Sequence, residues 1–141
     1  MAIDHFAQPT LSANSETLPA SLPGLSALLS SLFSESPLPR NIYIKVSGQY
    51  RLLPPSLTQP YTQLKQLFYQ FLDAGGSDRL VWGSDWPHTR FEGIDTIGWA
   101  AMVVQWCEEY VVAQGGGEEE VRRLVSRVFK DNADELWTGR R

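Results

Sequence analysis

The chain has 141 residues, an apolar fraction of 43% and a formal net charge of −4 at pH 7, which are ordinary values for a soluble globular domain. The negative charge excludes the basic surface that binds nucleic acid, and no run approaches the ~20 apolar residues of a membrane span. No signal-peptide pattern follows Met1, so we expect a cytoplasmic protein that contacts neither nucleic acid nor membrane. The length also excludes a complete (β/α)8 barrel, which needs about 250 residues.

Strand and helix patterns alternate along the chain. The segments with strand character are residues 2–6, 41–47 and 80–85. Apolar residues recur at helical spacing over residues 22–33, 61–72, 97–113 and 118–136. Because strands alternate with helices, we expect an α/β fold in which the strands are parallel and the helices pack outside them.

The alternation within the strands predicts which side chains point away from the helices, toward the axis of a barrel. The side chains expected to point inward are Ile3, His5, Tyr43, Lys45, Ser47, Val81, Gly83 and Asp85. An ammonium group on the inward face is costly unless it is paired. The alternative is that Lys45 lies on an edge strand and extends to solvent.

The segment Trp82-Gly83-Ser84-Asp85-Trp86-Pro87-His88 carries most of the chemical information. It follows an apolar strand, and the carboxyl ends of parallel strands are where α/β barrels hold their reactive groups. The chain has two histidines, His5 and His88, and both follow predicted strands. This placement favours an enzyme or part of one. The alternative for Asp85 is a structural role, in which its carboxylate caps the turn after the strand.

Other reactive or aromatic residues have simpler interpretations. The single cysteine, Cys107, lies in a helical run, and we expect a buried, unreactive thiol. We expect Trp82 and Trp86 to pack in the interior rather than to form a platform for a ligand.

Three segments together resemble the amidohydrolase-2 group of the amidohydrolase superfamily, and in particular its 2-pyrone-4,6-dicarboxylate lactonase branch. They are Asp4-His5-Phe6, Tyr43-Ile44-Lys45-Val46-Ser47-Gly48-Gln49-Tyr50-Arg51 and Trp82-Gly83-Ser84-Asp85-Trp86-Pro87-His88. The ending over residues 129–137 is similar to the last helix of that group. The resemblance implies that residues 1–141 form one partial domain. That domain would be the C-terminal portion of a (β/α)8 barrel, with about three strand–helix units and a C-terminal helix.

The resemblance also implies roles for four side chains. Asp85 matches the aspartate that activates water or binds a metal, and His5 matches a histidine that binds metal or polarises the carbonyl group. Arg51 matches an arginine that holds a substrate carboxylate, and His88 matches a substrate-binding position at the rim. A divalent metal such as zinc, held by Asp85 and His5, is implied by the superfamily. The lactonase branch, in contrast, is thought to work without a metal.

Two departures from the family pattern concern the first half of the site. The His-x-His pair of the first barrel strand has no counterpart in the 141 residues, and Ala7-Gln8-Pro9 stands where a Gly-Arg-Pro-like sequence is usual. The resemblance therefore implies a truncated hydrolase that acts on a lactone or related anionic carbonyl compound and lacks part of its site. The alternatives are a decarboxylase of the same superfamily and a non-catalytic fragment that associates through exposed barrel edges.

Overall fold

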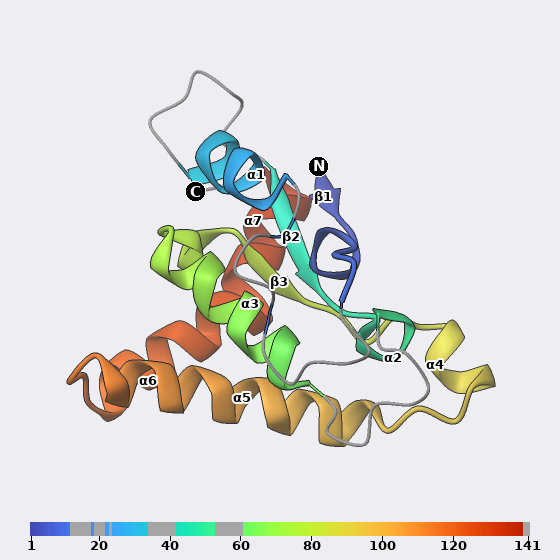
Figure 1. The fold of residues 1–141 in the computed structure, drawn as a ribbon. Coiled ribbons are helices and arrows are strands. Elements are labelled where there is room, and N and C mark those ends of the chain that lie inside the picture. Colours follow the sequence, from blue (N-terminus) through green and yellow to red (C-terminus); the bar gives the residue numbers. More distant parts are fainter. Residues whose placement is uncertain (12–17, 19–21, 23, 34–41, 53–60, 140–141) are drawn as a thin grey trace.

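The computed structural model of the chain describes residues 1–11, 18, 22, 24–33, 42–52 and 61–139 (Figure 1). Its strands are β1 (Ala2–Ile3), β2 (Tyr43–Val46) and β3 (Leu80–Trp82). Its α-helices are α1 (Leu25–Phe33), α2 (Gln49–Leu52), α3 (Thr62–Asp73), α4 (His88–Phe91), α5 (Thr96–Ala113), α6 (Glu118–Ser126) and α7 (Asn132–Thr138). Two 3-10 turns, η1 (His5–Ala7) and η2 (Gly76–Asp78), and a π-helical turn, η3 (Arg127–Asp131), complete the described elements.

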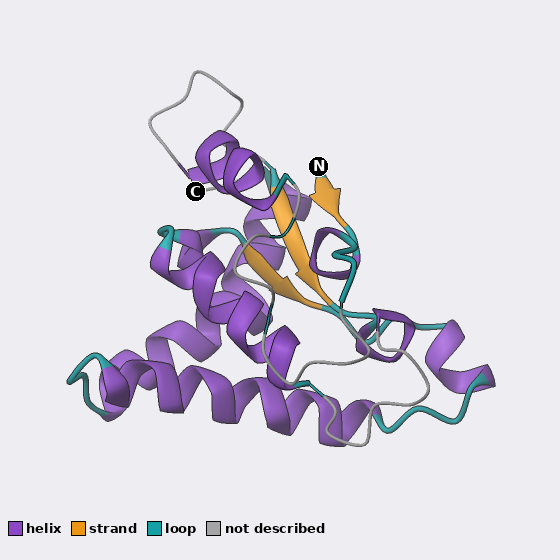
Figure 2. Ribbon diagram, in the orientation of Figure 1, coloured by secondary structure: helices purple, strands orange, loops and turns teal. Residues whose placement is uncertain are grey.

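The three strands form one parallel sheet in the order β1-β2-β3. Figure 2 shows α1 and α3 on one side of the strands and α7 on the other. The prediction of a mixed α/β fold with parallel strands is confirmed. The structure places β2 between β1 and β3, in the centre of the sheet, so the alternative that Lys45 lies on an edge strand is wrong.

The core lies between the sheet and the helices α3 and α5. Ile44, Val46 and Leu80 are fully buried on one face of the sheet. Residues spaced three and four apart on α3 meet this face, because that spacing places them on one side of the helix; they are Leu64, Leu67, Phe68 and Phe71. Aromatic contacts join α3 to α5, with the rings of Phe68 and Trp106 5.8 Å apart.

The first strand is shorter than the sequence pattern predicts. The strand expected over residues 2–6 ends at Ile3, and the chain then enters the turn η1, in which both His5 and Phe6 have a φ of 53°. Ile3 pairs in register with Ile44 and packs against the core, so the prediction that Ile3 points inward is wrong. The alternation fails there because a left-handed turn interrupts the extended backbone on which the pattern depends.

The helices agree with the predicted positions except near the two ends of the chain. Helix α1 begins at Leu25, three residues after the start of the predicted segment 22–33. Helices α3 and α5 begin and end within one residue of the predicted segments 61–72 and 97–113. The helix expected over residues 118–136 is divided by the turn η3 into α6 and α7. The short helices α2 and α4 were not predicted, because four residues are too few for apolar periodicity.

Three interior predictions can be compared with the structure. Cys107 is buried, and burial raises the pKa of its thiol to about 12, as expected for an unreactive cysteine. Trp82 packs as expected, because its ring stacks on Phe129 at 5.2 Å. Trp86 is 70% exposed, so the prediction that it packs in the interior is wrong.

Among the described residues, no helix is long and apolar enough to cross a membrane.

Candidate active site at the strand ends

The candidate site is formed by the segments that leave the carboxyl ends of the three strands. His5 follows β1 by two residues, Ser47 follows β2 directly, and Asp85 follows β3 by three residues. Asp85 has a φ of 63°, so the chain turns sharply there, and the main-chain N–H of His88 donates to its carbonyl oxygen at 3.0 Å. Aspartate is one of the few residues with a side chain that tolerates this conformation. Parallel strands thus bring together residues that are far apart in the sequence.

His5 is held between Ser47 and Asp85. Its Nδ1 lies 3.1 Å from the hydroxyl oxygen of Ser47, and its Nε2 lies 3.8 Å from Oδ1 of Asp85. The side chains are 16% exposed for His5 and 9% for Asp85, so solvent reaches both only slightly. Gly48 has a φ of 62°, and a Cβ atom at this position would collide with Nδ1 of His5. A glycine is therefore needed for the imidazole to lie against the main chain.

The second oxygen of Asp85 is bound by two residues of α2. The hydroxyl group of Tyr50 donates to Oδ2 at 2.6 Å, and Nε of Arg51 lies 3.0 Å from the same oxygen. Arg51 Nε also donates to the Tyr50 hydroxyl oxygen at 3.1 Å, so the three side chains form a closed group. The role of Tyr50 was missed from the sequence. Its place beside Arg51, in the segment that follows β2, was the available signal.

These contacts determine the charge state of Asp85. Burial acts to raise the pKa of its carboxyl group, but the Tyr50 hydrogen bond and the charges of His5, Arg51 and His88 outweigh it and lower the pKa. In Tyr50, burial and the neighbouring carboxylate raise the pKa of the hydroxyl group. Asp85 is therefore an ionised carboxylate at neutral pH, and Tyr50 is a neutral hydrogen-bond donor.

Three further residues lie around this group. His88 is exposed at the start of α4, and its charge acts on Asp85. Glu92, which follows α4, places Oε1 3.7 Å from Nη2 of Arg51. Lys45 is paired, with its Nζ 2.7 Å from Oδ1 of Asp4, so its cost on the inward face is offset.

The described residues fit a metal centre poorly. His5 and Asp85 supply two donors, whereas a catalytic zinc site takes three protein ligands. No group of three or more His, Cys, Asp or Glu side chains that could hold a metal ion occurs in the described part of the chain. The guanidinium group of Arg51 also contacts the Asp85 carboxylate, and a cation there opposes the approach of a second cation.

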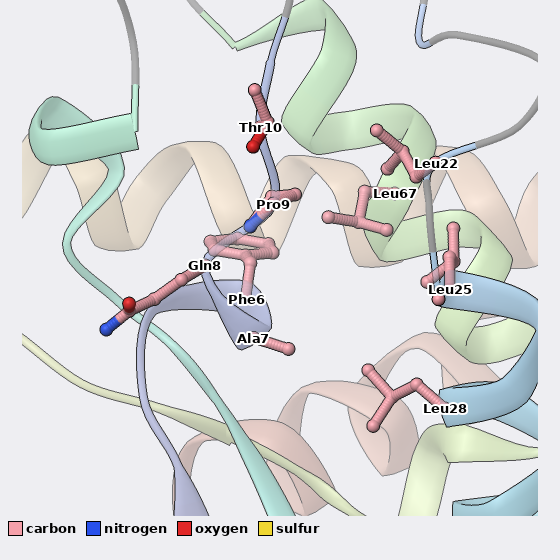
Figure 3. A pocket seen from close by; sticks show the side chains of 10 residues that line it. Phe6, Ala7, Gln8, Pro9, Thr10, Leu22, Leu25, Leu28 and Leu67 are labelled. Carbon is pink, nitrogen blue, oxygen red and sulfur yellow. The ribbon is translucent and has the colours of Figure 1, made fainter.

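Two cavities of the described structure are lined by other residues. One cavity, of about 260 Å³, lies beside η1 and α3. Figure 3 shows side chains that line it, among them Phe6, Leu22, Leu25 and Leu67. A second cavity of about 410 Å³ lies between the sheet and α7, where Lys45 and Val81 face Leu136 and Trp137. Neither His5 nor Asp85 lines either cavity.

Comparison with known proteins identifies related enzymes. The chain is 28% identical, over 79% of its length, to L-fucono-1,5-lactonase of Burkholderia ambifaria. Its structure is similar to that of a probable 2-pyrone-4,6-dicarboxylic acid hydrolase of Acinetobacter baumannii crystallised with citric acid, with a TM-score of 0.59 and 26% identity over 97% of the chain. A candidate hydrolase of the same kind from Pseudomonas putida gives a TM-score of 0.51 and 29% identity over 97% of the chain.

The chain spans only part of each of these proteins. It covers 35% of the lactonase, 43% of the Acinetobacter protein and 42% of the Pseudomonas protein. The amidohydrolase family pattern matches residues 1–138, which is nearly the whole chain. With the parallel strands and the polar group at their carboxyl ends, this match establishes that the chain belongs to the amidohydrolase family.

Proposed function

We propose that residues 1–141 form the C-terminal portion of a (β/α)8-barrel hydrolase that opens a lactone or a related carbonyl compound bearing a carboxylate. The order of the parallel strands along the sheet follows their order in the sequence, as in a barrel. The lactonase and the two hydrolases to which the chain is similar support the substrate class. This portion would contribute the end of the barrel that carries Asp85.

The observation that carries the proposal is the asymmetric environment of Asp85. Its Oδ2 is bound by Tyr50 and Arg51, while its Oδ1 faces His5. In the proposed reaction, Oδ1 takes a proton from water as the water oxygen attacks the carbonyl carbon of the lactone. The ring C–O bond then breaks, and the protonated Asp85 returns its proton to the leaving ring oxygen.

His5 would stabilise the charge that forms on the carbonyl oxygen. If the hydroxyl group of Ser47 donates to Nδ1, the imidazole carries its proton on Nε2, the nitrogen that faces Asp85. That N–H can donate to the developing oxyanion, which is where hydrogen bonds assist most. Arg51 would bind the substrate carboxylate, since a guanidinium group suits bidentate contact, and His88 would line the rim.

Replacing Asp85→Asn tests this proposal, because an amide keeps the shape of the side chain but cannot accept the proton. We expect hydrolysis of 2-pyrone-4,6-dicarboxylate or L-fucono-1,5-lactone to fall by roughly a hundredfold to ten-thousandfold, measured by the absorbance or acidity change on ring opening. Asp134→Asn is the matched control, because this exposed aspartate of α7 pairs only locally with Lys130.

Retention of lactone hydrolysis in the Asp85→Asn variant would contradict the proposal. Release of CO2 from a carboxylated substrate, without ring opening, would instead favour the decarboxylase alternative. Both products are measured in the same reaction, so the two reaction classes are separated directly.

A further inference from the structure

Arg51, the proposed carboxylate anchor, is shared between two acidic residues. Its Nε contacts Oδ2 of Asp85 at 3.0 Å, and its Nη2 lies 3.7 Å from Oε1 of Glu92. The same guanidinium group also donates a hydrogen bond, from Nε, to the hydroxyl oxygen of Tyr50. A substrate carboxylate that approaches Arg51 therefore meets a cation whose charge two carboxylates already offset.

The two acidic partners differ in how firmly they are held. Asp85 is 9% exposed and is bound by the Tyr50 hydroxyl group as well as by Arg51. Glu92 is 50% exposed, and its contact with Arg51 is the longer of the two. An ion pair as exposed as that of Glu92 with Arg51 contributes little to the stability of the contact, because water solvates the separated charges well.

The position of Glu92 in the chain also allows its side chain to move. It follows the four-residue helix α4, to which it is joined by a main-chain hydrogen bond from its N–H to the carbonyl oxygen of His88 at 3.1 Å. Gly93 comes next with a φ of 65°. The backbone is thus held while the half-exposed side chain can change rotamer.

We propose that Glu92 competes with the substrate carboxylate for Arg51 and so lowers the affinity of this site for anions. Glu92 occupies the guanidinium group in the free protein and is displaced when an anionic ligand binds. Every anion that pairs with Arg51 must displace Glu92, so the displacement lowers the affinity for all of them and weakly bound anions are not retained. This inference rests on the anchoring role of Arg51 in the proposed function.

Calorimetric titration with citrate, a carboxylate-rich probe, tests the proposal at low ionic strength. Glu92→Gln removes the charge and keeps the shape of the side chain, and we expect it to bind citrate roughly twofold to fivefold more tightly than the unmodified protein. Arg51→Gln should bind citrate more weakly. Glu118→Gln, an exposed glutamate paired with Arg122 on α6, is the matched control and should leave binding unchanged.

The double variant Arg51→Gln/Glu92→Gln shows whether Glu92 acts through Arg51. If it does, the double variant binds citrate as Arg51→Gln does, because nothing remains for Glu92 to compete for. Unchanged, weaker or undetectable binding in Glu92→Gln would overturn the proposal. The two proposals can fail independently. If Glu92→Gln binds citrate more tightly but the unmodified protein hydrolyses no lactone, the proposed function fails and the competition by Glu92 stands.

Discussion

The close contact between Gly48 and His5 is the main steric constraint in the candidate site. Gly48 has a φ of 62°, and its lack of a side chain leaves room for the imidazole. The same ring reaches both Ser47 and Asp85. The main chain at the end of β2 therefore determines the position of a side chain that belongs to the segment after β1.

The Gly48→Ala variant should displace His5. We expect the loss of its contact with Ser47 and a loss of about 1–2 kcal/mol in the free energy of unfolding from backbone strain, with a further loss from the collision. Urea unfolding gives the stability, and ¹⁵N NMR of the His5 ring reports its environment. Gly115→Ala is the matched control, because Gly115 has a φ of 80° and open space around it. Equal losses in the two variants would contradict the steric role of Gly48.

The pH dependence of stability reports on Tyr50 and Asp85. The pKa of Asp85 is lowered in the folded protein, so its contribution to stability is present above the unfolded pKa of about 3.9 and is lost as the pH falls through the folded pKa. Tyr50→Phe removes a hydrogen bond that lowers this pKa, so the acid loss of stability should move to higher pH. Urea unfolding from about pH 7 down to about pH 2 measures the shift.

A second pair of variants assigns this shift to one carboxylate. In an Asp85→Asn background no carboxyl group remains at this position to titrate, so adding Tyr50→Phe should leave the shape of the acid profile unchanged. A shift that persists in this background would show that Tyr50 acts on another group.

At the level of elements, a buried asparagine forms a polar link between the carboxyl-terminal helices and the sheet. Asn132, at the start of α7, is fully buried and donates through Nδ2 to the carbonyl oxygens of Ser77 and Leu80, both at 2.8 Å. The π-helical turn η3 precedes it and separates α6 from α7. Residue 132 thus connects α7 to the start of β3, the strand that leads to Asp85.

Asn132→Ala should destabilise the fold, because it removes the donor from two carbonyl groups, one in η2 and one at the start of β3. We expect a loss of about 1–3 kcal/mol for each carbonyl group left buried without a partner, measured by urea unfolding. Lys130→Ala, at an exposed position of the neighbouring turn, should change the stability by no more than about 0.5 kcal/mol. Similar losses in both variants would contradict the connecting role of Asn132.

At the level of the whole molecule, the outer edges of β1 and β3 have no strand partner among the described residues. Unpaired strand edges favour association with another chain. We expect the 141-residue chain to self-associate as its concentration rises, which sedimentation velocity would show as a mass above 15.8 kDa. A constant mass of 15.8 kDa across the concentration range would contradict this. Association without lactone hydrolysis would favour the non-catalytic alternative over the proposed enzyme.

The sequence predicted the main elements and part of the site. The helical spacing on α3 and α5 is a local property, so those helices were located within one residue. His5 and Asp85 were expected near one another because parallel strands bring their carboxyl ends together, and the structure places them 3.8 Å apart. The local structure differs from the prediction, because His5 lies on a turn and not on a strand.

The sequence by itself determined the alternation of strands and helices, the segments that carry the polar groups and the family to which they belong, because these depend on neighbouring residues and short motifs. Only the tertiary structure decided that Ile3 faces the core, that Tyr50 donates to Asp85 and that Glu92 shares Arg51. The physical reason is that these relations depend on strand register and on turns with left-handed backbone. Such features join segments tens of residues apart and leave no periodic pattern in the sequence.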